Sequence, residues 1–166
     1  MQILPETDAA ELFHRLVAEQ VPGRRGLAAW RSLLRAHATL MRRLDTDLEQ
    51  ETGLALADFD VLAQLAEAHG TLRMTELADR ALISRSGMSR RVARLADEGL
   101  LRRDRAGTDG RGVVVALTQA GITRLAETAP VHARGISTLF VAQLDDQELA
   151  LLERALNKVI VDCSFG

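Results

Sequence analysis

The hydrophobic pattern in the middle of the chain changes from a helical period to a strand period, and this change constrains the fold most strongly. Three short helical segments come first, over Ala57–His69, Thr75–Ala81 and Ser84–Glu98, the second beginning at a capping threonine and the third at a capping serine. The apolar run Val113–Leu117 is typical of a strand, and the turn residues of Ala106–Gly110 connect it to a preceding arm. Three helices followed by a two-stranded β-hairpin predict a winged helix-turn-helix.

Helices flank this central part on both sides, so the expected fold is mainly α. A segment over Asp8–Glu19 ends at the breaker Val21-Pro22-Gly23. Two further helices are expected after the hairpin, beginning at the capping residues Thr118 and Asp145, and Pro130 is expected to kink or interrupt the first of them.

A long helix that ends at Gly53 carries an apolar seam in which successive members are three or four residues apart. The members of this seam are Leu27, Trp30, Leu34, His37, Met41, Leu44 and Leu48. Such a helix has more apolar surface than a small domain covers alone, so we expect a homodimer. The predicted organisation is a dimerisation part over residues 1–54, a DNA-binding lobe over 55–118 and a second dimerisation part over 119–166.

Charge is divided unevenly along the chain. Residues 71–117 contain ten arginines and six acids, a net charge of +4, whereas the whole chain has a net charge of −2. A basic middle within an acidic frame is typical of a segment that faces nucleic acid. No apolar stretch approaches the roughly 20 residues that span a bilayer, and the N-terminus lacks an apolar signal core. We therefore expect no membrane partner and a cytoplasmic protein.

The helix expected over Ser84–Glu98 separates apolar from basic side chains. Met88, Val92 and Leu95 fall on one side and are expected to be buried. The other side presents hydroxyls and guanidiniums, groups that suit the edges of bases and the phosphates of DNA, and no acid occurs from residue 81 to residue 96. The predicted DNA contacts of this helix are Ser84, Arg85, Ser86, Ser89, Arg90, Arg91 and Arg94. An ordinary solvated helix surface is the alternative.

The tip of the hairpin adds Arg105, Thr108, Asp109 and Arg111. An arginine here is expected to reach the minor groove or a phosphate. Alternatively, an Asp–Arg pair only holds an exposed turn, and both roles are compatible.

Three pieces of this region together resemble the multiple-antibiotic-resistance regulator (MarR) family. They are TELA at Thr75, SRSGMSRRVARLADEGLLRR at Ser84 and DGRGVVVALTQAG at Asp109, the last matching a wing signature of Asp-x-Arg followed by a strand and Leu-Thr-x-x-Gly. The resemblance covers about Gly26–Ile160. It implies a dimer built by the first long helix and the last two, a recognition helix from Ser84, and a minor-groove arginine at Arg111. The segment before Gly26 is longer than the basic pattern and resembles an additional first helix that reinforces the dimer.

The same resemblance implies a small aromatic or phenolic acid as effector. Trp30, Arg31 and His37 are the candidate ligand-binding residues, because an aromatic face beside a cation suits a planar anion. Packing in the dimer interface is the alternative, and the place of Trp30 and His37 in the seam favours it. No metal site is expected, since His14, His37, His69 and His132 lack ligand spacing, and Cys163, the one cysteine, is expected to have no redox role.

These features predict a sequence-specific DNA-binding regulator, expected to be a repressor, that binds a pseudo-palindromic operator and responds to a small molecule. No cofactor and no enzymatic activity are expected, since the chain has no glycine-rich cofactor loop and no nucleophile with a plausible histidine partner. The alternatives are a winged-helix adaptor that binds only protein and a dimerisation domain related to a transferase.

Overall fold

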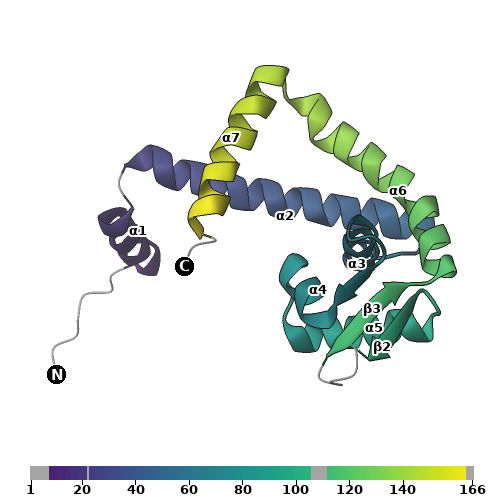
Figure 1. Ribbon diagram of the computed structural model, residues 1–166. Helices are drawn as coiled ribbons and strands as arrows, with labels where there is room; N and C mark the ends of the chain where they lie inside the picture. Colours follow the sequence, from purple (N-terminus) through teal and green to yellow (C-terminus); the bar gives the residue numbers. More distant parts are fainter. Residues whose placement is uncertain (1–7, 22, 106–111, 164–166) are drawn as a thin grey trace, which may run out of the picture. The chain divides into compact units, whose positions relative to one another are not determined.

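The computed structural model describes residues 8–21, 23–105 and 112–163, and the chain divides into two compact units, Met1–Leu40 and Met41–Gly166 (Figure 1). The first unit contains helix α1 (Ala9–Gln20) and the beginning of helix α2 (Arg24–Thr52). Asp8 caps α1 by accepting a 3.0 Å hydrogen bond from the backbone N–H of Ala10. The predicted N-terminal helix is therefore confirmed.

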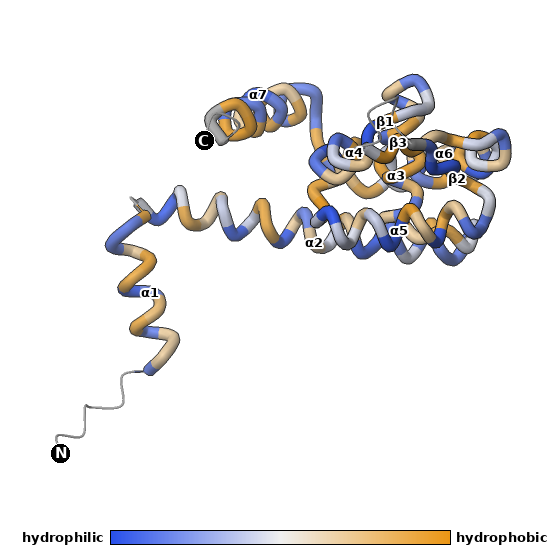
Figure 2. The backbone as a smooth tube through the Cα atoms, turned by 60° about the horizontal axis from the view of Figure 1, so that its bottom comes forward, coloured by the Kyte–Doolittle hydropathy of each residue, from blue (hydrophilic) through white to orange (hydrophobic). Residues whose placement is uncertain are grey.

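No described side chain of the first unit is buried. Leu12, Phe13 and Leu16 of α1 are all exposed, and so are Trp30 and Leu34 of α2. Figure 2 shows these helices with hydrophobic and hydrophilic positions interspersed along their length. The early part of the predicted seam thus presents its apolar groups at the surface of the chain.

The second unit contains the end of α2, the winged-helix elements and the C-terminal helices. Their bounds are α3 (Leu56–Glu67), β1 (Thr71–Arg73), α4 (Met74–Arg80), α5 (Arg85–Asp97), β2 (Leu101–Arg105), β3 (Val113–Leu117), α6 (Gln119–Leu139), a 3-10 turn η1 (Val141–Gln143) and α7 (Asp146–Cys163). The predicted order of three helices, a hairpin and two further helices is confirmed.

The sheet has three antiparallel strands in the order β1-β3-β2, so the predicted hairpin of β2 and β3 gains one strand that sequence analysis did not predict. The added strand is only three residues long, and it pairs with β3, where Leu72 lies opposite Val115. This strand also moves the start of the next helix, because Arg73 is extended and its N–H donates to Glu76 at 3.0 Å. The expectation that Thr75 caps that helix is wrong.

The core lies among α3, α4, α5 and the sheet. The predicted buried side of α5, Met88, Val92 and Leu95, is fully buried, and Leu62 and Leu65 of α3 are buried with it. These side chains hold α5 by one face and leave the opposite face at the surface.

The end of α2 belongs to this core. Leu48 is fully buried, and the Asp45 carboxylate accepts a 2.8 Å hydrogen bond from the N–H of Leu56 at the start of α3. The guanidinium of Arg124 on α6 donates to the carbonyl of Thr52. Two elements thus fix the last turns of the long helix.

Helix α6 runs without a break through Pro130, so the expected interruption does not occur. A proline removes one backbone hydrogen bond, and the remaining bonds of this 21-residue helix continue on both sides. The predicted caps are confirmed, with Thr118 accepting from Gly121 N–H at 3.0 Å and Asp145 from Glu148 N–H at 2.8 Å.

Candidate nucleic-acid interface

Helix α5 begins at a serine cap, and the first two residues of its first turn are exposed. The Ser84 hydroxyl accepts a 3.2 Å hydrogen bond from the N–H of Gly87. Gly87 is tightly placed, since a Cβ there would lie 3.0 Å from the side chains of Ile83 and Ser84. The partial positive charge of the helix N-terminus lies at this turn, beside the exposed Arg85 and Ser86.

Arg85 and Arg90 are two of the four arginines of α5. Both are exposed, and no ion pair joins either of them to another residue that the structure describes. Ser86 and Ser89 lie exposed beside them. This face offers donors and positive charge without a described acid to neutralise it.

Arg91 and Arg94 differ from the other two arginines because an acid from α3 binds both. One carboxylate oxygen of Asp58 accepts from Arg91 Nη1 and from Arg94 Nη2, the latter at 2.5 Å. Arg94 also donates to Glu98 at 2.9 Å. The hydrogen bond to Asp58, more than that to Glu98, holds the pKa of Arg94 above its usual value.

Sequence analysis did not identify Asp58. It is only 4% exposed and lies on the buried side of α3, one and two turns before Leu62 and Leu65. An acid in register with buried leucines indicates a charge that needs an internal partner, and this spacing could have revealed it.

The wing is described only in part. In β2, Arg102 forms an ion pair with Asp104 at 2.7 Å, and Arg103 is exposed. Thr108, Asp109 and Arg111 lie outside the described residues, as does the side chain of Arg105. Their predicted contacts remain predictions.

A second group of polar residues lies where α3 packs on α6. The ring centroids of Phe59 and His132 are 4.5 Å apart, and His132 Nδ1 is buried without a hydrogen-bond partner among the described residues. Burial lowers the pKa of His132 and raises the pKa of Asp60. No group of histidine, cysteine and carboxylate side chains suited to a metal occurs in the described part of the chain.

The predicted ligand residues Trp30, Arg31 and His37 are all exposed on α2. All three belong to the first unit and lie on the same helix, α2. None of the described helices is long and apolar enough to cross a bilayer.

Known proteins share both the sequence and the fold. A family model described as MarR family matches residues 52–112. A MarR family transcriptional regulator from Streptomyces coelicolor, solved in complex with DNA, is 33% identical, with a TM-score of 0.78 over 84% of this chain and 92% of that one. The chain belongs to the MarR family.

Two further relatives agree with the MarR assignment. AbsC, another MarR family transcriptional regulator from Streptomyces coelicolor, is 28% identical with a TM-score of 0.80, over 88% of this chain and 99% of that one. An uncharacterised HTH-type transcriptional regulator from Bacillus cereus is 28% identical over 134 residues, 81% of this chain and 88% of the relative. This MarR family protein is therefore a DNA-binding transcriptional regulator and not an enzyme, as sequence analysis predicted.

Proposed function

We propose that this MarR family protein is a cytoplasmic homodimeric repressor that binds a pseudo-palindromic operator through α5, and that a small aromatic or phenolic acid changes its affinity. The observation that carries the proposal is the exposed face of α5. Arg85 and Arg90 on this face form no ion pair with the described residues, and the opposite side is fixed in the core. Two such helices, one from each protomer, would lie about 34–36 Å apart to match one turn of DNA.

Each group on this face has a distinct role in the proposal. Arg90 donates two parallel hydrogen bonds to a guanine edge, and the hydroxyls of Ser86 and Ser89 approach bases or phosphates closely. The first turn of α5, with Ser84 and Arg85, binds a phosphate. The wing residues Arg105, Thr108, Asp109 and Arg111 would contact the adjacent minor groove or its phosphates.

Exposed apolar groups support the homodimer. Leu12, Phe13 and Leu16 on α1 and Leu151 on α7 are each more than two-fifths exposed, an arrangement that a second copy would cover. We assign dimerisation to residues 1–54 and 119–166 and DNA binding to 55–118. The additional helix α1 would add to the interface.

The effector proposal depends on α2. Trp30 is 55% exposed, and Arg31 and His37 are exposed on the same helix. An aromatic face with a neighbouring cation suits the carboxylate and ring of an aromatic acid.

The DNA-binding proposal is tested with Arg90→Ala. We expect operator affinity to fall about 10- to 100-fold, because a bidentate contact discriminates one base pair by about 1–3 kcal/mol. Binding is measured by fluorescence anisotropy on the operator and on duplexes with single base changes. The variant should also discriminate less at the base that Arg90 reads.

Arg43→Ala is the matched control, because Arg43 is an exposed arginine of α2 that pairs only weakly with Asp47, at 3.9 Å. It should bind the operator as the wild type does. In transcription from the operator-containing promoter, the wild type should lower transcript levels and R90A should not. Equal operator affinities for R90A and R43A would contradict the role of α5, and raised transcription with wild-type protein would contradict repression.

A further inference from the structure

One buried carboxylate holds two of the four arginines of the recognition helix α5. Asp58 accepts from Arg91 and Arg94 through the same oxygen, Oδ1, although these arginines lie 33 and 36 residues further along the chain. The exposed fraction of the side chain is 6% for Asp58, 28% for Arg91 and 49% for Arg94. The acid is thus inside the protein, and the arginines reach inward to it.

The burial of Asp58 favours its pairing with Arg91 and Arg94. A buried carboxylate that lost both partners would remain desolvated and uncompensated, an expensive state. The Nε of Arg91 is also buried, which places part of this guanidinium inside the protein. Arg94 has a second acid, Glu98, on its solvent side.

The consequence is a cancellation of charge on α5. Asp58 and Glu98 together neutralise Arg91 and Arg94, so the cations left for a nucleic acid are Arg85 and Arg90. An arginine that binds phosphate adds affinity for every sequence alike, whereas an arginine that reads a base adds affinity for one. Phosphate contacts from Arg91 and Arg94 would therefore strengthen binding to every duplex and leave the ratio of operator to random binding unchanged.

We propose that Asp58 lowers the affinity of α5 for DNA of any sequence: by holding Arg91 and Arg94 it keeps them from the phosphates, so that α5 presents Arg85 and Arg90 to DNA. This inference rests on the proposed function, since it assumes that α5 meets the operator. It changes the predicted contact set, because Arg91 and Arg94 become positioning residues that do not touch DNA.

The test replaces the carboxylate with a neutral group of the same shape, Asp58→Asn. We expect the affinity for a random duplex to rise about tenfold at 0.1 M salt for each arginine that gains a phosphate. The slope of log affinity against log salt should steepen by about 0.9 for each such arginine. Operator affinity should rise by about the same factor, because the added phosphate contacts do not depend on sequence.

Glu98→Gln is the matched control, because it removes the same charge from the exposed partner of Arg94 and leaves Asp58 in place. Its salt slope on random duplex should equal that of the wild type. A D58N slope equal to that of E98Q would overturn the proposal, since charge alone would then explain any change in affinity. Urea unfolding of both variants shows whether a lower affinity comes from lost stability.

Arg94→Gln tests the same idea without relying on the fold of D58N, because Arg91 still pairs with Asp58. We expect its salt slope on random duplex to match that of the wild type, and a slope shallower by about 0.9 would overturn the proposal. Different outcomes test the proposed function and the role of Asp58. Wild-type protein that ignores the operator contradicts the proposed function, whereas wild-type binding with an unchanged D58N slope contradicts only the role of Asp58.

Discussion

Leu82, in the turn between α4 and α5, occupies a conformation that suits glycine better than leucine. Its φ is 53°, in the left-handed region, and its side chain is 93% exposed. The left-handed region costs a non-glycine residue about 1–3 kcal/mol, and an exposed leucine recovers little of that by packing. The turn that precedes α5 is therefore strained.

Replacing Leu82 with glycine should stabilise the protein. We expect the free energy of unfolding of Leu82→Gly to rise by about 1 kcal/mol, because relief of the left-handed strain exceeds the added entropy of an unfolded glycine. Urea unfolding at one fixed protein concentration measures this. Leu82→Ala keeps the strain and removes the same side chain, so its free energy of unfolding should stay close to that of the wild type. A higher free energy of unfolding for Leu82→Ala but not for Leu82→Gly would contradict the strain argument.

Gly121 shows that a residue of the family signature can act through packing. A Cβ at this position would lie 2.2 Å from the carbonyl oxygen of Leu100. The Thr118 hydroxyl donates to the carbonyl of Gly99 at 2.7 Å and accepts from Gly121 N–H. The threonine and glycine of LTQAG thus fasten the start of α6 to the connection between α5 and β2.

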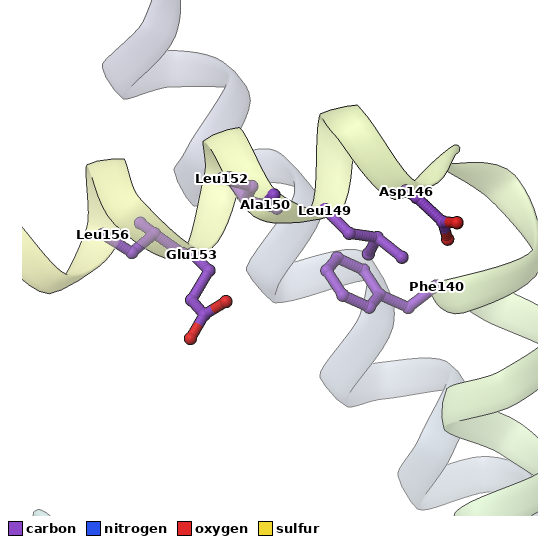
Figure 3. Close-up of a pocket in the computed structure, with 7 residues that line it drawn as sticks. All are labelled: Phe140, Asp146, Leu149, Ala150, Leu152, Glu153 and Leu156. Carbon is purple, nitrogen blue, oxygen red and sulfur yellow. The ribbon is translucent and has the colours of Figure 1, made fainter.

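At the scale of elements, α7 has an apolar side that is only partly covered by the described residues. None of its described side chains is buried. Leu149, Leu152 and Leu156 line a groove of about 500 Å³ with Phe140, and Figure 3 shows the phenyl ring beside Leu149. Leu149, Leu152 and Leu156 follow one stripe of the helix, which favours packing against another helix.

An acid on α7 should weaken the proposed dimer. Leu151 is 57% exposed, so Leu151→Glu should leave the fold of one chain intact while burying a charge in the interface. Light scattering after gel filtration should give twice the chain mass of 18.1 kDa for the wild type and a shift toward one chain for L151E.

Asn157→Glu, which adds the same charge at an exposed polar position of α7, serves as the control and should remain dimeric. If L151E and N157E had equal masses, Leu151 would lie outside the interface. A wild-type mass of one chain would contradict the homodimer itself.

At the scale of the whole molecule, the proposed effector residues lie in the first unit, whereas α5 lies in the second. Trp30 is the one tryptophan of a chain without tyrosine, so intrinsic fluorescence reports on α2 directly. The effector proposal therefore has a local readout, the Trp30 emission, and a distant one, operator affinity.

Titration with 4-hydroxybenzoate should change Trp30 emission saturably and lower operator affinity about tenfold, a typical size for coupling between sites. Arg31→Ala should weaken the response because it removes the cation beside the ring, and Arg43→Ala should not. Saturable emission with unchanged operator affinity would show binding without regulation. Emission that does not saturate would remove Trp30 from the ligand site.

Short-range chemistry made much of this protein predictable from its sequence. The caps at Ser84, Thr118 and Asp145 bind N–H groups within three residues, and the buried stripe of α5 follows from helical spacing alone. Interactions of this range depend only on neighbouring residues, so the order of helices and hairpin could be inferred before any packing was known.

Tertiary structure alone decided which arginines of α5 are free. Strand β1 exists because β3 pairs with it, and Gly121 is tight because the carbonyl of Leu100 lies against it. Likewise, Arg91 and Arg94 are both held by Asp58, an acid from another helix that no spacing within α5 reveals. The charges near a side chain depend on its neighbours in space and not only in the sequence. Residues distant in the sequence share a hydrogen bond only after the core has brought their helices together.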